Sequence, residues 1–263
     1  MQIPDIKKKL EFLKWLDPFT YVDLFIMPKL NPKKDKMIEW VVYIVSAFLF
    51  AFIIYTGLGM LFHTPSPMVI VVSGSMEPVM FRGDVVVLNG KTVDEIKGQE
   101  VEFNEPISGV PVKDYLETFC TGTLSESPMN CIDYFKLAPE RGISPSSFKA
   151  VKIKFSNGKA IDIGTDGDVI VYFSQRLNEP IIHRVVAKIK AKDGIFFLTK
   201  GDSINNPLLD QELGISAYAI PHSEIQGIAV LRVPLLGYVK LLIFDDLTNL
   251  IFGCKRAGGC PFP

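Results

Sequence analysis

The chain has 263 residues, 48% of them hydrophobic, a formal net charge of −1 and a mean hydropathy of +0.25. This length accommodates a membrane anchor and one further domain of about 200 residues. The nearly balanced charge argues against a nucleic-acid partner, and the hydropathy is too low for a protein with many membrane spans.

The N-terminal segment, residues 1–36, is basic and mixes lysines with Leu, Phe and Trp. This pattern predicts either a helix resting on the inner membrane leaflet or a disordered basic tail. The next stretch, 40–62, carries no charge and is long enough to cross a hydrocarbon core of about 30 Å. We predict an uncleaved transmembrane anchor over 37–62, because no small-residue cleavage site follows it.

The lysines around the anchor predict its orientation. Several precede it, and residues 63–81 contain neither Lys nor Arg. The positive-inside rule therefore places the N-terminus in the cytosol and the remainder of the chain outside.

Beyond the anchor, the recognisable elements are short strands bounded by Gly, Pro and Asn. They cover 68–72, 84–88, 151–155, 169–173, 181–189, 195–198 and 227–231. Strands and helices do not alternate, so we predict a mainly β domain formed by 63–103 and 166–234. Arg184 is expected to be a solvent-facing residue on one of these strands.

Residues 104–165 are predicted to form a loop-rich insertion, peripheral to the β domain and dispensable for catalysis. Cys120 and Cys131 lie in it, outside the membrane, where a disulfide would persist. Cys254 and Cys260 are a second candidate pair. Neither spacing is CxxC and no His cluster accompanies them, so no metal site is expected.

The C-terminal segment, 235–263, is apolar but contains Lys240, Asp245 and Asp246. Charges at these positions would be costly in the middle of a bilayer. We predict an amphipathic helix on the outer membrane surface, with a second membrane crossing as the alternative.

One short segment between two predicted strands carries a candidate nucleophile. Residues 73–78 read Ser-Gly-Ser-Met-Glu-Pro and follow the anchor closely. A serine in a tight turn just outside a membrane is well placed to attack a carbonyl of an emerging chain. The segment alone also fits an ordinary Gly/Pro turn.

Two later segments supply what a serine nucleophile needs, namely a base and a carboxylate that orients the base. His183 lies within a strand pattern, and a histidine accepts a proton at neutral pH without deep burial. Asp202 follows Gly201 at the end of another strand, and Asp210 comes soon after. Both aspartates also fit simple turn chemistry.

These segments together resemble signal peptidase I of the archaeal and endoplasmic-reticulum type. The matching pieces, in chain order, are SGSMEP (73–78), RGDVVVL (82–88), DGDVIVYF (166–173), IIHRVV (181–186) and LTKGD (198–202) with a downstream Asp. The ordered set spans residues 40–232. The chain departs from the family pattern in the longer loop before Asp210 and in the insertion at 104–165.

The resemblance implies a signal-peptidase-like β catalytic domain and a role for each site residue. Ser75 would be the nucleophile, His183 the base, and Asp210 the carboxylate that orients the base. Asp202 would support the site by a hydrogen bond. The backbone N–H of Ser75 and the hydroxyl of Ser73, which also fits a turn-stabilising role, would bind the oxyanion. No metal and no cofactor is implied.

The predicted function is that of a membrane-anchored serine endopeptidase that removes N-terminal signal peptides and cuts after small residues. Its predicted partners are signal-peptide-bearing preproteins and the lipid bilayer, with the protein-translocation channel as a further candidate. An archaeal cell membrane is favoured over the endoplasmic reticulum. Two alternatives stay open: a related serine peptidase that processes itself or a dedicated precursor, and a non-catalytic membrane scaffold of the same fold. A scaffold would have no need of the serine, the histidine and the aspartates together.

Overall fold

The computed structural model describes residues 14–15, 17–90, 92–140, 142 and 147–242. The chain divides into two compact units, residues 1–61 and 62–263.

The described part of the N-terminal unit is helical. It contains α2 (Pro18–Tyr21), the π-helical turn η1 (Val22–Ile26), α3 (Met27–Leu30) and α4 (Lys36–Leu61). Asp17 caps α2 by accepting a hydrogen bond from Phe19 N at 3.0 Å. Between α3 and α4, Asn31 and Asp35 exchange two hydrogen bonds of 2.7 Å. The sequence predicted either a helix or a disordered tail for the basic segment, and residues 18–30 of it are helical.

Helix α4 is long and apolar enough to cross a membrane. It has 26 residues, and an 18-residue stretch within it has a mean hydropathy of 2.3. At 1.5 Å per residue its length is about 39 Å, which exceeds the hydrocarbon core of a bilayer. The predicted anchor, 37–62, coincides with this helix to within one residue at each end.

The C-terminal unit is built mainly from β strands, so the predicted fold class is confirmed. The strands are β1 (Met68–Ile70), β2 (Val85–Asn89), β3 (Gln99–Phe103), β4 (Leu116–Gly122), β5 (Ser125–Asn130), β6 (Phe148–Phe155), β7 (Ala160–Asp162), β8 (Val169–Ser174), β9 (Glu179–Ala191), β10 (Gly194–Lys200), β11 (Ile220–Pro221) and β12 (Ile225–Val233). The helical segments are η2 (Val93–Glu95), η3 (Val112–Asp114), α5 (Cys131–Glu140), η5 (His222–Glu224) and α6 (Tyr238–Lys240). Every strand predicted from the sequence overlaps one of these strands.

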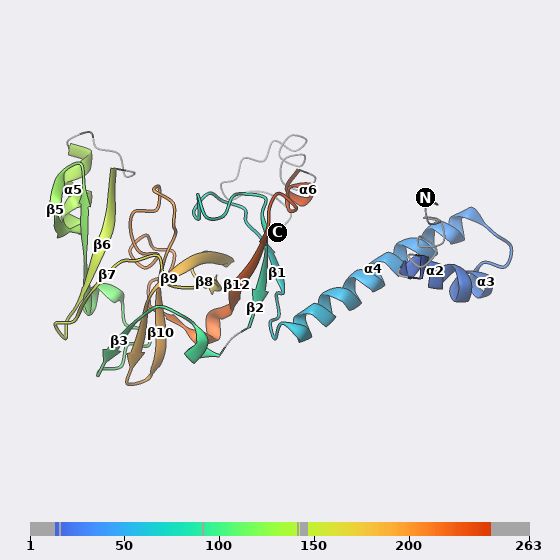
Figure 1. The fold of residues 1–263 in the computed structure, drawn as a ribbon, viewed down its shortest axis with the longest axis horizontal. Coiled ribbons are helices and arrows are strands. Elements are labelled where there is room, and N and C mark those ends of the chain that lie inside the picture. Colours follow the sequence, from blue (N-terminus) through green and yellow to red (C-terminus); the bar gives the residue numbers. More distant parts are fainter. Residues whose placement is uncertain (1–13, 16, 91, 141, 143–146, 243–263) are drawn as a thin grey trace, which may run out of the picture. The chain divides into compact units, whose positions relative to one another are not determined.

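The main sheet has eight strands in the order β1-β2-β12-β8-β9-β10-β11, with β3 beside β9 (Figure 1). Neighbouring strands are antiparallel, except that β3 and β9 run parallel. Strand β9 has 13 residues, so it pairs with β8 along its first half and with β3 along its second half. His183 lies in the first half, near the middle of the sheet.

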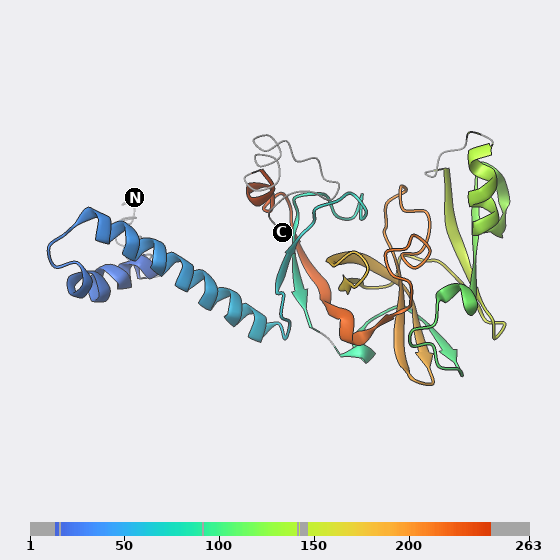
Figure 2. The same ribbon diagram turned by 180° about the vertical axis from the view of Figure 1, so that it is seen from behind.

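The segment predicted as a loop-rich insertion forms a second sheet, which we call the insertion sheet, with the strand order β5-β4-β6-β7. Helix α5 lies against β4 and β5 (Figures 1 and 2), and a disulfide joins Cys120 in β4 to Cys131 at the start of α5. In β6, buried apolar residues alternate with exposed lysines, as expected for a sheet with one solvated face.

The insertion sheet is not peripheral, because it shares a hydrophobic core with the main sheet. One cluster of buried residues combines Leu116 and Ile153 of the insertion sheet with Val186 and Leu198 of the main sheet. Interiors of this kind are close-packed, so removing one sheet would expose the buried face of the other.

The predicted C-terminal segment, 235–263, is described only as far as residue 242, and α6 is its one described helix. The predicted amphipathic helix therefore falls largely outside the described residues. The candidate Cys254–Cys260 pair lies outside them entirely.

Candidate active site

The turn that carries Ser75 is anchored at both ends by the main sheet. After β1, Val71 N donates to Asp84 O at 2.9 Å, and Gly83 N donates back to Val71 O at 2.8 Å. Within the turn, Met76 is completely buried and packs into the same apolar cluster as Val71. Because Met76 is held in the core, the neighbouring Ser75 is presented at the surface with little freedom to move.

Ser75 itself is half-buried and makes two contacts that bear on its chemistry. Its hydroxyl lies 3.2 Å from the hydroxyl of Ser73. Its carbonyl oxygen accepts a hydrogen bond of 2.9 Å from Ser203 N, in the turn that follows β10. The second contact joins the serine turn to the segment that leads to Asp210.

His183 and Asp210 form a buried pair. The His183 Nδ1 atom lies 2.7 Å from each of the two Asp210 carboxylate oxygens. The side chains of both residues are almost inaccessible to solvent, at 3% and 0% exposed respectively. A carboxylate at Nδ1 favours the tautomer whose Nε2 is free to accept a proton.

Two hydroxyls that the sequence analysis did not single out complete the environment of Asp210. Tyr172 and Thr199 donate to Asp210 Oδ2 at 2.9 and 2.5 Å. Burial and the nearby Asp210 carboxylate raise the pKa of Tyr172 above its ordinary range, so its hydroxyl stays protonated and donates. Three hydrogen-bonding partners thus compensate the cost of burying this carboxylate.

The strand register explains why these groups converge. His183 pairs with Ile170, so Tyr172, two residues further along β8, lies on the same face of the sheet. Thr199 pairs with Val185, two residues along β9 from His183, and shares that face too. Both hydroxyl residues belong to motif segments that the sequence analysis had quoted. Tyr172 and Thr199 could have been identified as neighbours of Asp210 from their position on the sheet face that carries His183.

Gly201 lies beside both the serine turn and the histidine. A β-carbon at this position would come within 2.6 Å of Ser75 O and 3.1 Å of His183 Nε2. Only a residue without a side chain allows the two segments to lie this close together.

Replacing Gly201 with alanine is therefore expected to destabilise the fold by about 1–3 kcal/mol and to push the serine turn away from His183. Thermal denaturation measures the first effect. A matched control is Gly109→Asn, at an open turn position where an added β-carbon meets no neighbour within 4 Å and asparagine tolerates the positive φ of 71°. A Gly201→Ala protein as stable as wild type would contradict this account of the close approach.

Asp202 and Arg184 form an ion pair beside the site. Arg184 contacts both carboxylate oxygens of Asp202, with its shortest N–O distance at 2.7 Å, and also donates to Gly167 O at 2.7 Å. The prediction that Arg184 faces solvent is wrong, because its side chain is only 14% exposed. Asp202 binds this arginine and not the histidine, so the structure brings only Asp210 to His183.

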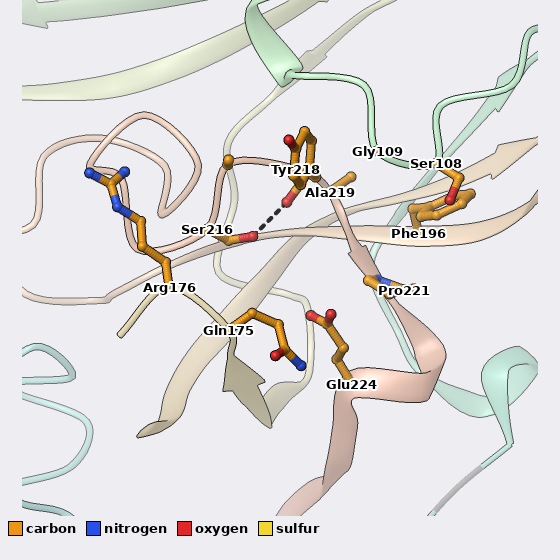
Figure 3. A pocket seen from close by; sticks show the side chains of 11 residues that line it. Ser108, Gly109, Gln175, Arg176, Phe196, Ser216, Tyr218, Ala219, Pro221 and Glu224 are labelled. Atoms are coloured by element: carbon orange, nitrogen blue, oxygen red, sulfur yellow. Dashed lines mark hydrogen bonds between the residues drawn. The ribbon is translucent and has the colours of Figure 1, made fainter. Parts of the chain in front are cut away.

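One cavity of the C-terminal unit does not contain the serine or the histidine. It has a volume of about 460 Å³ and lies near Arg176, Phe196 and Glu224 (Figure 3). Within the described ranges, no group of three or more His, Cys, Asp or Glu side chains is arranged to hold a metal ion.

The fold and the site together define a β-rich domain with a membrane-length helix and the parts needed for nucleophilic acyl transfer. In this structure the Ser75 hydroxyl hydrogen-bonds Ser73 and not His183. Catalytic hydrogen bonds are often long or misaligned without substrate, so this geometry is compatible with His183 as the base for Ser75.

No protein-family model matches the chain. The chain is 27% identical over 200 residues, 74% of each protein, to the signal peptidase complex catalytic subunit SEC11 of Colletotrichum graminicola. It is 26% identical over 204 residues to that of Scheffersomyces stipitis, covering 76% of this chain and 79% of the relative. An uncharacterized protein of Methanocaldococcus jannaschii is 27% identical over 179 residues, 65% of this chain and 81% of the relative. The chain is thus a distant homologue of signal peptidase catalytic subunits, and the predicted resemblance is confirmed.

Proposed function

We infer that this protein is a membrane-anchored serine endopeptidase that removes N-terminal signal peptides from secreted and membrane preproteins. The observation that carries this inference is the buried His183–Asp210 pair next to the Ser75 turn. It occurs in a chain homologous to proteins named as signal peptidase catalytic subunits. The membrane-length helix α4 would keep the site close to the bilayer in which a signal peptide lies.

In the proposed mechanism, Ser75 Oγ attacks the scissile carbonyl while His183 Nε2 takes the hydroxyl proton. The Asp210 carboxylate stabilises the imidazolium that forms, and His183 then returns the proton to the leaving amine. Water next attacks the acyl-enzyme with the same histidine as base.

The oxyanion would be stabilised by the backbone N–H of Ser75 and the hydroxyl of Ser73. Among the described residues the Ser75 N–H donates to no other group, so it is available to a substrate. The Ser73 hydroxyl is already beside the nucleophile, at 3.2 Å. The loss of one such donor typically lowers the rate by about 10²–10³-fold.

The proposed substrate is an extended peptide with small residues at the first and third positions before the cut. Strand β1, which leads into the serine turn, is at the end of the main sheet's strand order. Its outer edge is suited to pairing with an extended substrate by β-augmentation. We propose that the protein-translocation channel, from which preproteins emerge, is its neighbour in an archaeal cell membrane.

The proposed topology places the N-terminus in the cytosol and the catalytic unit outside. Protease added to right-side-out vesicles is expected to cleave within 62–263 and to spare residues 1–36. Terminal epitope tags and immunoblotting measure this, and vesicles opened by detergent provide the control. Digestion of residues 1–36 alone would show the inverted topology and contradict the secretory role.

The direct test of the function is cleavage of a labelled preprotein by the detergent-solubilised protein. Wild type is expected to release the signal peptide at a single site after a small residue, and Ser75→Ala is expected to release none. Mass spectrometry of the products identifies the cut. Cleavage of the protein's own chain or of one dedicated precursor only would favour the related-peptidase alternative, and no cleavage at all would favour the scaffold.

A further inference from the structure

The segment that carries Asp210 is a long connection between β10 and β11, residues 201–219, here called the Asp210 loop. On the main-sheet side it is held by Asp210 N, which donates to Thr199 O at 2.9 Å. A connection of this length has many conformations available unless other parts of the chain restrain it. The buried position of Asp210 therefore needs a second support.

That support comes from the insertion sheet, which packs on both residues that precede Asp210. Leu208 is buried in a cluster with Cys120 and Ala150 of the insertion sheet. Leu209 is buried in a different cluster, which includes Leu116. The two residues immediately before Asp210 are thus each buried in an apolar cluster that includes residues of the insertion sheet.

Polar contacts join the same two parts of the chain. Ala150 N, at a bulge in the pairing of β6 with β4, donates to Pro207 O in the loop at 2.8 Å. Thr118 in β4 donates from its hydroxyl to Glu212 Oε1. The other carboxylate oxygen of Glu212 accepts from Leu209 N at 3.2 Å, which closes the turn around Asp210.

The identity of Thr118 is informative, because this residue lies on the inner face of β4 between two buried apolar positions. It is only 3% exposed. An apolar side chain would pack there at no polar cost, whereas a buried hydroxyl needs a partner. Burial also raises the pKa of Glu212, and the hydrogen bonds from the Thr118 hydroxyl and the Leu209 N–H oppose this increase. The hydrogen bond between Thr118 and Glu212 therefore links β4 to the Asp210 loop in a way that apolar packing alone would not.

We propose that the insertion sheet is a positioning element for catalysis, and that Thr118 and Glu212 are positioning residues that hold Asp210 against His183. The proposal rests on the function inferred above. A catalytic carboxylate must be held to within a fraction of an ångström, and a displacement of about 1 Å caused by a remote change can lower the rate about 10²-fold. On this proposal the insertion is needed for full activity, contrary to the prediction from the sequence that it is dispensable for catalysis.

The test compares Thr118→Val and Glu212→Ala, which remove the bond, with Thr118→Ser and Glu212→Gln, which retain a hydrogen-bonding group. Thr121→Val, on the same strand and half-buried, is the matched control. Two quantities are measured: kcat and KM on a reporter preprotein, and the NMR signal of the His183 Nδ1 proton. The NMR signal reports the bond to Asp210 without any substrate, and the chain's three histidines make its assignment straightforward.

Both bond-removing variants are expected to lower kcat about 10–100-fold with little change in KM, and to shift or broaden the Nδ1 proton signal. The double variant should be no slower than the worse single variant, because both remove the same contact. Thr118→Ser, Glu212→Gln and the control should stay within about threefold of wild type.

A folded Thr118→Val protein with wild-type kcat and an unchanged proton signal would overturn the proposal. If Thr118→Val does not fold, Glu212→Ala decides by the same two measurements, since Glu212 is only half-buried. If wild type cleaves no preprotein, the proposed function fails. The proton signal of the variants then still decides whether the insertion sheet positions Asp210.

Discussion

Replacing Ser75 with alanine is expected to lower the rate of preprotein cleavage by about 10⁶-fold, because the acyl-enzyme of the proposed mechanism forms on the Ser75 hydroxyl. The fold should be unaffected. Ser75 is half-buried and, among the residues that the structure describes, its hydroxyl bonds only to Ser73, while the packing of the turn depends on Met76. Initial rates with a labelled preprotein, together with thermal denaturation in detergent, measure both effects.

Ser127→Ala is the matched control, since it removes an exposed serine hydroxyl that lies in the insertion sheet. It should cleave at the wild-type rate. A Ser75→Ala protein that retains more than a small fraction of wild-type activity would remove Ser75 as the nucleophile. Another hydroxyl, with Ser73 the nearest, would then have to be tested in its place.

Replacing His183 with glutamine is expected to cause a loss of similar size, because an amide cannot accept the serine proton at neutral pH. Glutamine is chosen because it fills most of the volume of this buried side chain. Residues that act as a unit are non-additive, so the double variant Ser75→Ala/His183→Gln should be no slower than either single variant. Losses that multiply would indicate two independent contributions and contradict the shared role.

The main sheet was predictable because its strands have strong local patterns. Short apolar runs bounded by Gly, Pro and Asn mark β2, β8 and β9, and the structure has strands at each of them. The residues Ser75, His183 and Asp210 were singled out from turns and strands in these runs, and the structure brings them into one region. Their catalytic roles stay predictions until variants are assayed.

The insertion sheet was not predictable in the same way, because its polar residues fit either a loop or the solvated face of a strand. Ser125 and Glu126 are typical of a loop, yet they lie on β5, whose outer face is solvated. The inner face of β4 shows the buried alternation, but Thr118 interrupts it with a polar residue. The buried hydroxyl of Thr118 donates to Glu212, which is 94 residues away in sequence. Local patterns cannot indicate a contact of that range.

The choice between the two aspartates depends on the course of a loop, which local sequence does not determine. Asp202 and Asp210 both follow the glycine turn after β10, and both fit turn chemistry. In the structure the chain directs Asp202 to Arg184 and returns Asp210 to the sheet face that carries His183. The prediction that Arg184 faces solvent was wrong for the same reason, because Asp202, with which Arg184 pairs, belongs to that loop.

Replacing Asp210 with asparagine is expected to lower kcat by about 10⁴-fold, whereas Asp202→Asn should cost about tenfold or less. An amide at position 210 can donate to His183 Nδ1, which stabilises the tautomer whose Nε2 carries a proton and cannot accept one from Ser75. Where the amide nitrogen replaces Oδ2, both Tyr172 and Thr199 lose their present acceptor.

The cost of Asp202→Asn should instead appear mainly in stability. Its carboxylate pairs with a nearly buried arginine, and removal of one partner of such a pair destabilises a protein by about 3 kcal/mol. Measuring kcat and the midpoint of thermal unfolding for both variants separates the two roles. If Asp202→Asn proves the slower enzyme and Asp210→Asn remains active, then Asp202 orients the histidine during catalysis. The loop would in that case have to rearrange when substrate binds, because in this structure only Asp210 reaches His183.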